Sequence, residues 1–151
     1  LLCRQYLGWP REHRGMKAGA YYLLDNLPSA KKLDSSQPWF YYIYYATQVM
    51  RNMGGTFWQK WNDAMKATLL PTQRKTGSPA GSWDPVERYG RHGGRIYVTS
   101  LAICTLEVYY RHMPLYDSVP VIASLPRSGG QGDTSLGNSP AGKEKHEVFT
   151  P

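Results

Sequence analysis

Two kinds of apolar pattern alternate along the chain. Apolar side chains occupy most positions of residues 1–7, 39–53 and 96–112, whereas residues 15–26 and 56–70 carry them at helical spacing with polar residues between. A helix that is apolar all round is buried on most sides, and an amphipathic helix turns one face to water. The pattern therefore predicts an all-α fold of about five helices, in which buried and half-exposed helices alternate.

Glycine and proline mark the ends of these predicted helices. Gly8-Trp9-Pro10 ends the first, and Leu27-Pro28 ends the second, because a residue before proline is biased away from helical backbone. Pro38 suits the first turn of the third helix. Gly54-Gly55 closes that helix, and Pro71, which does not fit inside a helix, ends the fourth.

The longest predicted loop covers residues 72–94 and is rich in glycine and proline. A loop of this length inside a compact domain is functional or is held by its own packing, and Trp83 is the expected anchor here. We expect Asp84-Pro85 to form a tight turn and Gly93-Gly94 to let the chain enter the last helix closely.

The all-apolar stretches recur at intervals of about 45 to 57 residues, which is typical of a repeat of helix hairpins. An open array would leave the apolar helices at its ends exposed, whereas a closed ring would cover them. With about two and a half hairpins, the chain would form an arc of such a ring. The first residues already read as helix and include no initiating methionine, so we expect a piece of a longer protein.

Five motifs occur in a recognisable order: YIYYATQVMRNMGG at 42–55, FWQKWN at 57–62, GSWDP at 81–85, HGGR at 92–95 and SLAICTLEVYYRHMPLY at 100–116. Together they resemble bacterial proteins with prenyltransferase and squalene-oxidase repeats, which are relatives of the terpenoid cyclases and protein prenyltransferases. The resemblance covers residues 1–116. It implies a partial α/α toroid of helix hairpins over these residues.

The same resemblance implies that Gln73 and Trp83 form a variant of the cyclase Gln-Trp motif, in which the glutamine caps a helix and stacks on a tryptophan of the next turn. The spacing is longer here, through Ser78, Pro79 and their neighbours. The Asp-x-Asp-Asp motif that donates the proton in squalene–hopene-type cyclases does not occur, and the Asp, Cys and His zinc set of prenyltransferases cannot be matched. The resemblance therefore predicts a fold but does not predict a particular activity.

Two functions stay open at this point. The first is a non-catalytic binding or scaffold module of a larger bacterial protein. The second is part of a terpenoid-cyclase-like enzyme that acts on an isoprenoid in an aromatic-lined cavity. The tyrosines Tyr41 and Tyr45 are candidates for either role, because aromatic faces attract cations and carbocations. The alternative for these tyrosines is that they only fill the core between helices.

The loop supplies a second group of candidate binding residues: Trp83, Asp84, His92 and Arg95. Asp84 and His92 flank the loop near Arg95, which would suit an acid–base pair or an anion site at a helix N-terminus. The alternative is structural, with Asp84 stabilising the turn. No catalytic residue is assigned from the sequence.

Charge and cysteine content limit the kinds of partner and ligand that we expect the chain to bind. The formal net charge is +7, but the basic residues are scattered, so we interpret them as solvated surface and expect no nucleic acid. Cys3 and Cys104 lie in apolar patterns and are expected to be buried. No ligand pair has metal-binding spacing, and we expect no metal and no cofactor. The expected partners are a hydrophobic or isoprenoid-like ligand, a protein partner and the remaining repeats of the parent chain.

Two further expectations concern membrane-spanning helices and the last residues of the chain. No apolar run approaches the roughly 18 residues that a membrane-spanning helix needs. Residues 117–151 are rich in Gly, Ser, Pro and Lys, and we expect a disordered tail there. Because residues before Leu1 are expected to be missing, no cellular location is predicted.

Overall fold

The structure is a computed structural model that describes residues 1–33 and 39–116. All regular secondary structure in these residues is helical, which confirms the predicted all-α class. The chain divides into two units, Leu1–Pro120 and Val121–Pro151, and every described helix belongs to the first. The tail predicted for residues 117–151 lies outside the described residues.

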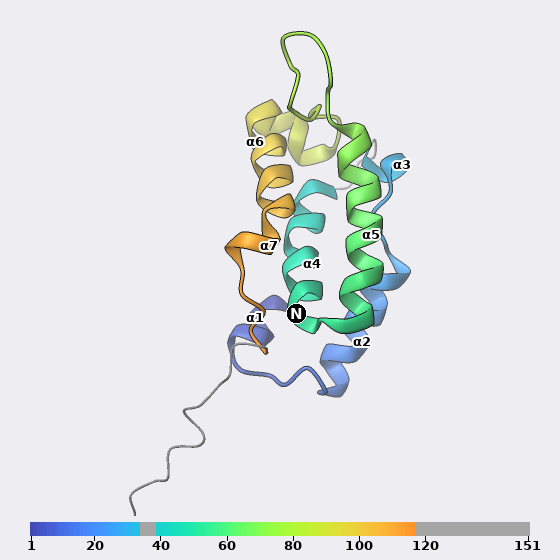
Figure 1. Ribbon diagram of the computed structural model, residues 1–151, viewed down its shortest axis with the longest axis vertical. Helices are drawn as coiled ribbons and strands as arrows, with labels where there is room; N and C mark the ends of the chain where they lie inside the picture. Colours follow the sequence, from blue (N-terminus) through green and yellow to red (C-terminus); the bar gives the residue numbers. More distant parts are fainter. Residues whose placement is uncertain (34–38, 117–151) are drawn as a thin grey trace, which may run out of the picture. The chain divides into compact units, whose positions relative to one another are not determined.

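Seven helices make up the described part of the chain (Figure 1). They are α1 (Leu2–Tyr6), α2 (Arg14–Asp25), α3 (Ala30–Leu33), α4 (Trp39–Met53), α5 (Gly55–Thr72), α6 (Arg88–Leu106) and α7 (Val108–Arg111). The first, second, fourth and fifth of them match the predicted ranges to within about two residues. The short helix α3 lies between Pro28 and Pro38, where no helix was predicted.

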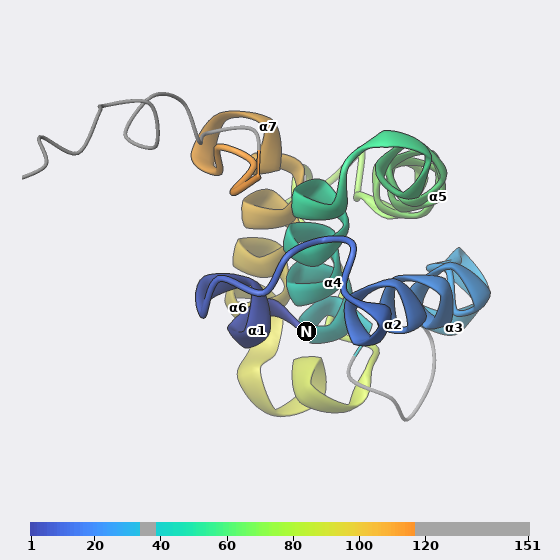
Figure 2. The same ribbon diagram turned by 90° about the horizontal axis from the view of Figure 1, so that it is seen from below.

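Helix α4 lies at the centre of the helical unit. It packs against every other described helix, with α2 and α5 on one side and α1 and α6 on the other (Figure 2). Figure 1 shows that α4 and α6 run in the same direction, whereas α2 and α5 run the opposite way. Residues on several sides of α4, such as Phe40, Ile43 and Met50, are buried. This confirms the prediction that residues 39–53 form a helix covered on most sides.

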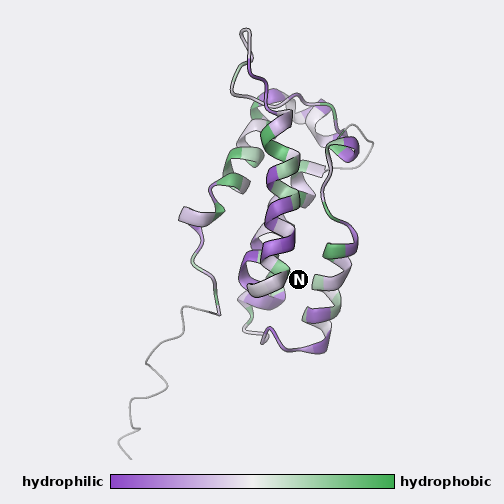
Figure 3. Cartoon of the chain, turned by 45° about the vertical axis from the view of Figure 1, so that its right-hand side comes forward, coloured by the Kyte–Doolittle hydropathy of each residue, from purple (hydrophilic) through white to green (hydrophobic). Residues whose placement is uncertain are grey.

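Helix α5 is amphipathic, as its sequence predicts. Trp61, Met65 and Leu69 are buried at helical spacing, while hydrophilic residues follow its outer side (Figure 3). The indole Nε1 of Trp61 donates a hydrogen bond of 2.9 Å to Oγ1 of Thr47 on α4, so this large ring is fixed in the core without an unpaired polar atom.

The last long helix begins earlier than predicted. The side chain of Glu87 accepts hydrogen bonds of 2.9 Å from the backbone N–H groups of Tyr89 and Gly90, so it caps α6 and residues 88–93 are helical rather than part of the loop. The helix then bends at Gly94, whose φ of 76° and ψ of −177° are not helical. The predicted helix over 96–112 ends instead at Leu106 and is followed by the separate turn α7.

Two predictions of burial are wrong. Cys3 is exposed and Cys104 is half-buried, and both are free thiols. The apolar stretches 1–7 and 96–112 are also less covered than expected, since Leu7 is 78% and Ile96 83% exposed. The reason is that only α4 has neighbours on several sides, whereas α1 and α6 pack on α4 with one face.

A chain of hydrogen bonds connects the two ends of the helical unit. The side chain of Gln5 donates to the carbonyl of Val49 (3.2 Å) and accepts from the amide of Asn52 (3.0 Å). The carbonyl oxygen of the Asn52 side chain accepts from the backbone N–H of Leu115 at 3.2 Å. Nearby, the hydroxyl of Tyr116 donates to the backbone carbonyl of Trp9 at 2.5 Å.

Candidate functional site

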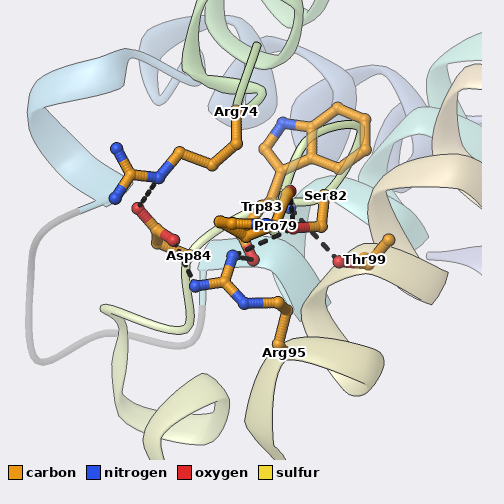
Figure 4. Close-up of polar contacts among 7 residues, drawn as sticks. All are labelled: Arg74, Pro79, Ser82, Trp83, Asp84, Arg95 and Thr99. Carbon is orange, nitrogen blue, oxygen red and sulfur yellow. Dashed lines mark hydrogen bonds and ion pairs between the residues drawn. The ribbon is translucent and has the colours of Figure 1, made fainter. Parts of the chain in front are cut away.

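Trp83 anchors the loop that connects α5 to α6. Its side chain is 2% exposed, and its indole Nε1 donates to the carbonyl of Leu69 on α5 at 2.9 Å. Its backbone N–H donates to Oγ1 of Thr99 on α6 at 3.2 Å (Figure 4). The ring therefore holds the loop against both helices, as its place in the sequence predicts.

Asp84 lies between two arginines in this loop. One carboxylate oxygen is 2.9 Å from Nε of Arg74 and the other is 2.6 Å from Nη2 of Arg95 (Figure 4). The hydrogen bond from Arg95, together with the charge of both arginines, holds the pKa of Asp84 below its ordinary value. Arg95 also donates to Oγ of Ser82 and to the carbonyl of Trp83, so its guanidinium is directed into the loop.

Gln73 follows the last residue of α5 and bonds within the loop. Its side-chain amide donates to the carbonyl of Gly81 at 2.9 Å, and its side-chain oxygen accepts from Lys75 at 3.1 Å. It thus helps to close the loop on itself. The stacking of Gln73 on Trp83 that the resemblance implies stays a prediction.

His92 is separated from the other loop candidates. Its ring Nδ1 lies 2.9 Å from the backbone carbonyl of Arg88, one helical turn earlier, and the side chain is exposed. The amides at the start of α6, which an anion would use, are occupied by the carboxylate of Glu87. The structure thus brings Trp83, Asp84 and Arg95 together in a structural cluster. A ligand role for His92 and Arg95 stays a prediction.

The tyrosines predicted from the sequence belong to a second place in the fold, a cluster that spans α4 and α6. The ring centroids are 4.7 Å apart for Tyr41 and Tyr45, 4.9 Å for Tyr44 and Tyr45, and 6.0 Å for Tyr41 and Tyr89. We call these four residues the tyrosine cluster. The hydrogen bond with Tyr45 raises the pKa of Tyr41. Tyr89 was missed from the sequence, because it lies in the part of α6 that was predicted as loop.

An open, mostly apolar groove of about 670 Å³ adjoins the tyrosine cluster. It is lined by Leu1, Leu2, Cys3, Leu23, Tyr41, Tyr42, Tyr45, Ala46 and Val49. These side chains come from the first residues of the chain and from α1, α2 and α4. The floor is fixed by Tyr42, whose hydroxyl donates to the carbonyl of Asn26 at 2.9 Å. Burial raises the pKa of Tyr42 to about 12, so this phenol stays neutral.

Leu1 forms part of the groove wall by packing on α2. A Cβ atom built at Gly19 would lie only 2.4 Å from Cδ2 of Leu1, so the glycine makes room for the leucine side chain. Leu1 and Leu2 are half-buried, as expected of residues that line an open groove. The sequence predicted the tyrosines of the groove, but the contribution of residues 1–3 depends on a contact between helices.

Over residues 1–33 and 39–116, no group of His, Cys, Asp or Glu side chains is arranged to hold a metal ion. None of the helices described in these ranges is both long and apolar enough to cross a bilayer. The candidate chemistry therefore consists of the groove with its tyrosines and the paired charges of the loop.

No family model, no curated protein and no solved structure matches the chain.

Proposed function

We propose that the chain is an arc of an α/α toroid of helix hairpins, and that it serves as a binding or scaffold module which takes an apolar ligand into the groove. The observation that carries this proposal is the groove of about 670 Å³, with its apolar lining and its tyrosines. Ligand sites are concave, mostly apolar and typically about 300–1,000 Å³ in volume.

The arrangement of the helices supports the toroid part of the proposal. Neighbouring α4 and α6 run in the same direction, and α5 returns between them along the chain, as successive hairpins of a repeat require (Figure 1). Two exposed apolar residues lie at the helices that flank α4: Leu7 directly follows α1, and Ile96 lies on α6. Further hairpins of a parent chain, or a protein partner, would cover such residues.

The lining of the groove supports an isoprenoid-like or other hydrophobic ligand. Leucine, valine and alanine side chains favour a hydrocarbon chain, because each buried methylene contributes roughly 0.8 kcal/mol. The rings of Tyr41 and Tyr45 offer flat faces beside this apolar wall. The hydroxyl of Tyr42 is engaged with Asn26, so the floor presents the apolar part of its ring.

The proposal is tested by titrating the chain with farnesol, an isoprenoid alcohol, and comparing two tryptophan variants, one on α1 and one at the residue that follows it. Cys3 lines the groove and is exposed, so Cys3→Trp should fill the groove and weaken binding at least about tenfold. Leu7→Trp is the matched control, because Leu7 is exposed but does not line the groove. Equal affinities of the two variants, or no binding by the original chain, would contradict the proposal.

The tyrosine cluster supports a second candidate, a terpenoid-cyclase-like enzyme. Aromatic faces such as those of Tyr41, Tyr45 and Tyr89 stabilise carbocations by cation–π attraction. The test is to incubate the chain with an isoprenoid diphosphate and to search for a cyclised hydrocarbon by mass spectrometry. A product that disappears with Tyr45→Leu would favour the enzyme, and the absence of product would favour the binding module.

A further inference from the structure

The tyrosine cluster and the groove share residues. Tyr41 and Tyr45 line the groove and also contact the other rings of the cluster. A ligand that fills the groove would therefore contact the rings of Tyr41 and Tyr45. The chemistry of the cluster determines what kind of end group fits there.

The tyrosine cluster differs from several other aromatic side chains in the described residues. Those side chains carry a cation of their own chain at 4.8–5.2 Å: Arg4 over Trp9, Arg11 over Tyr116, Lys32 over Trp39 and Arg51 over Trp58. No lysine or arginine of residues 1–33 or 39–116 stands over Tyr41, Tyr44, Tyr45 or Tyr89 in this way. Tyr41, Tyr45 and Tyr89 are also 41–45% exposed, so these rings can meet a cation from outside.

Two arginines of α6 that follow Tyr89 are held away from the rings. Nε of Arg91 donates to the carbonyl of Val86 in the loop at 2.8 Å. The guanidinium of Arg95 is bound by Asp84 at 2.6 Å. Neither side chain occupies the position over the rings that a bound cation would take.

A buried carboxylate contacts the backbone of one member of the cluster. Glu87 is 0% exposed, and its oxygens accept hydrogen bonds from the backbone amides of Tyr89 and Gly90. The pKa of Tyr97 is raised by burial and then by Glu87, Tyr41, Tyr89 and Tyr45, so Tyr97 lies within electrostatic reach of each of them. A negative charge near electron-rich rings favours a cation beside them.

We infer that the groove takes a free single-chain amphiphile with a quaternary ammonium head, the head lying against Tyr41, Tyr45 and Tyr89 and the hydrocarbon chain lying in the groove. This inference rests on the proposed function, since it names the class of apolar ligand. The ammonium head has no hydrogen-bond donor, so it needs ring faces rather than polar partners. The half-exposed rings supply those faces beside the apolar lining of the groove.

The test compares two amphiphiles of the same shape by calorimetry, both below their micelle concentrations. One is dodecyltrimethylammonium, and the other is a neutral analogue, dodecyldimethylamine N-oxide at pH 8, in which an oxygen replaces one methyl group and the head has no net charge. Cation–π attraction should make the cation bind about three- to thirtyfold more tightly. Equal affinities would overturn the inference and leave the proposed function intact, whereas failure of both to bind would overturn the proposed function as well.

A pair of variants at one position tests the role of the rings. Tyr45→Phe keeps the ring and should keep the preference for the cation. Tyr45→Leu keeps an apolar side chain but removes the ring face, so the two amphiphiles should bind this variant with nearly equal affinity. Retention of the preference in Tyr45→Leu would overturn the inference. If that variant does not fold, Tyr89→Leu on α6 makes the same comparison, because Tyr89 contacts Tyr41 from outside the groove lining.

A lipid headgroup carries the same ammonium group, so a vesicle experiment separates the two sources. The groove is bounded by α1, α2 and α4 and suits one chain, and we expect no flotation of the chain with phosphatidylcholine vesicles. Flotation with these vesicles would overturn the assignment to a free amphiphile.

Discussion

Individual side chains hold the connection between α5 and α6 in place. Trp83 fills space between the two helices and leaves no polar atom of its ring unpaired. Asp84 joins Arg74 from the beginning of the loop to Arg95 beyond its end. The loop therefore behaves as part of the packed structure rather than as a free recognition segment.

Replacing Trp83 should be among the most destabilising single changes in the helical unit. For Trp83→Ala we expect the free energy of unfolding to fall by roughly 3–5 kcal/mol, as for other buried aromatic side chains. Trp83→Phe should cost less, since it keeps a ring and loses the hydrogen bond to Leu69. Urea denaturation measures both, and a Trp83→Ala change within error would mean that the loop is not anchored by this ring.

The charge cluster around Asp84 predicts an acid dependence. Because the pKa of Asp84 is lower in the folded state than its ordinary value of 3.8, its ionised form adds stability above about pH 4, and this contribution is lost as the pH falls through the folded pKa. The pairs are partly exposed, so we expect about 1 kcal/mol or less. Urea unfolding of Asp84→Asn from pH 7 to pH 2 should lack this part of the pH dependence; an unchanged profile would refute the assignment.

At the scale of the element, α6 depends on two adjacent glycines for different reasons. Gly94 has a positive φ with an extended ψ, a conformation that only glycine adopts easily, and nothing lies within 4 Å of a Cβ built there. Gly93 is helical, but a Cβ there would lie 2.6 Å from Cγ of Tyr97. One glycine therefore permits the bend, and the other makes room for a ring.

This difference leads to a prediction that a double-mutant cycle can check. Gly94→Ala should destabilise by about 1–3 kcal/mol through backbone strain, and the cost should be the same in a Tyr97→Ala background. Gly93→Ala should also cost about 1–3 kcal/mol, but Tyr97→Ala should relieve part of it, because the crowding involves that side chain. Costs that respond alike to Tyr97→Ala would contradict the distinction.

Periodicity predicts the helices well where local sequence decides them. The central helix α4 and the amphipathic α5 follow from their apolar patterns, and Trp83 was expected to be buried. The start of α6 was missed because Glu87 acts as the cap, whereas Ser, Thr, Asp and Asn are the residues expected there. The bend at Gly94 was read as the end of a loop, since glycine pairs also occur in loops.

At the scale of the whole helical unit, the local apolar pattern predicts the exposure of side chains less well than it predicts the helices. Apolar content predicted the same burial for residues 1–7, 39–53 and 96–112, yet only α4 is enclosed by its neighbours. The number of neighbours depends on the order in which helices pack, and this is a property of tertiary contacts. The groove illustrates the same limit: Tyr41 and Tyr45 could be named from the sequence, but Leu1 and Leu2 required the packing of Leu1 against α2 and of α1 against α4.

The link between the two ends of the helical unit has a consequence for the order of folding. The contact of Tyr116 with Trp9 and that of Leu115 with Asn52 span 107 and 63 positions of sequence. Closing such long segments costs entropy that nearer contacts do not, so these bonds should form late. During synthesis, the carbonyl oxygen of Trp9 and Oδ1 of Asn52 can form these bonds only after residues 115 and 116 have left the ribosome. Until then, water solvates both acceptors.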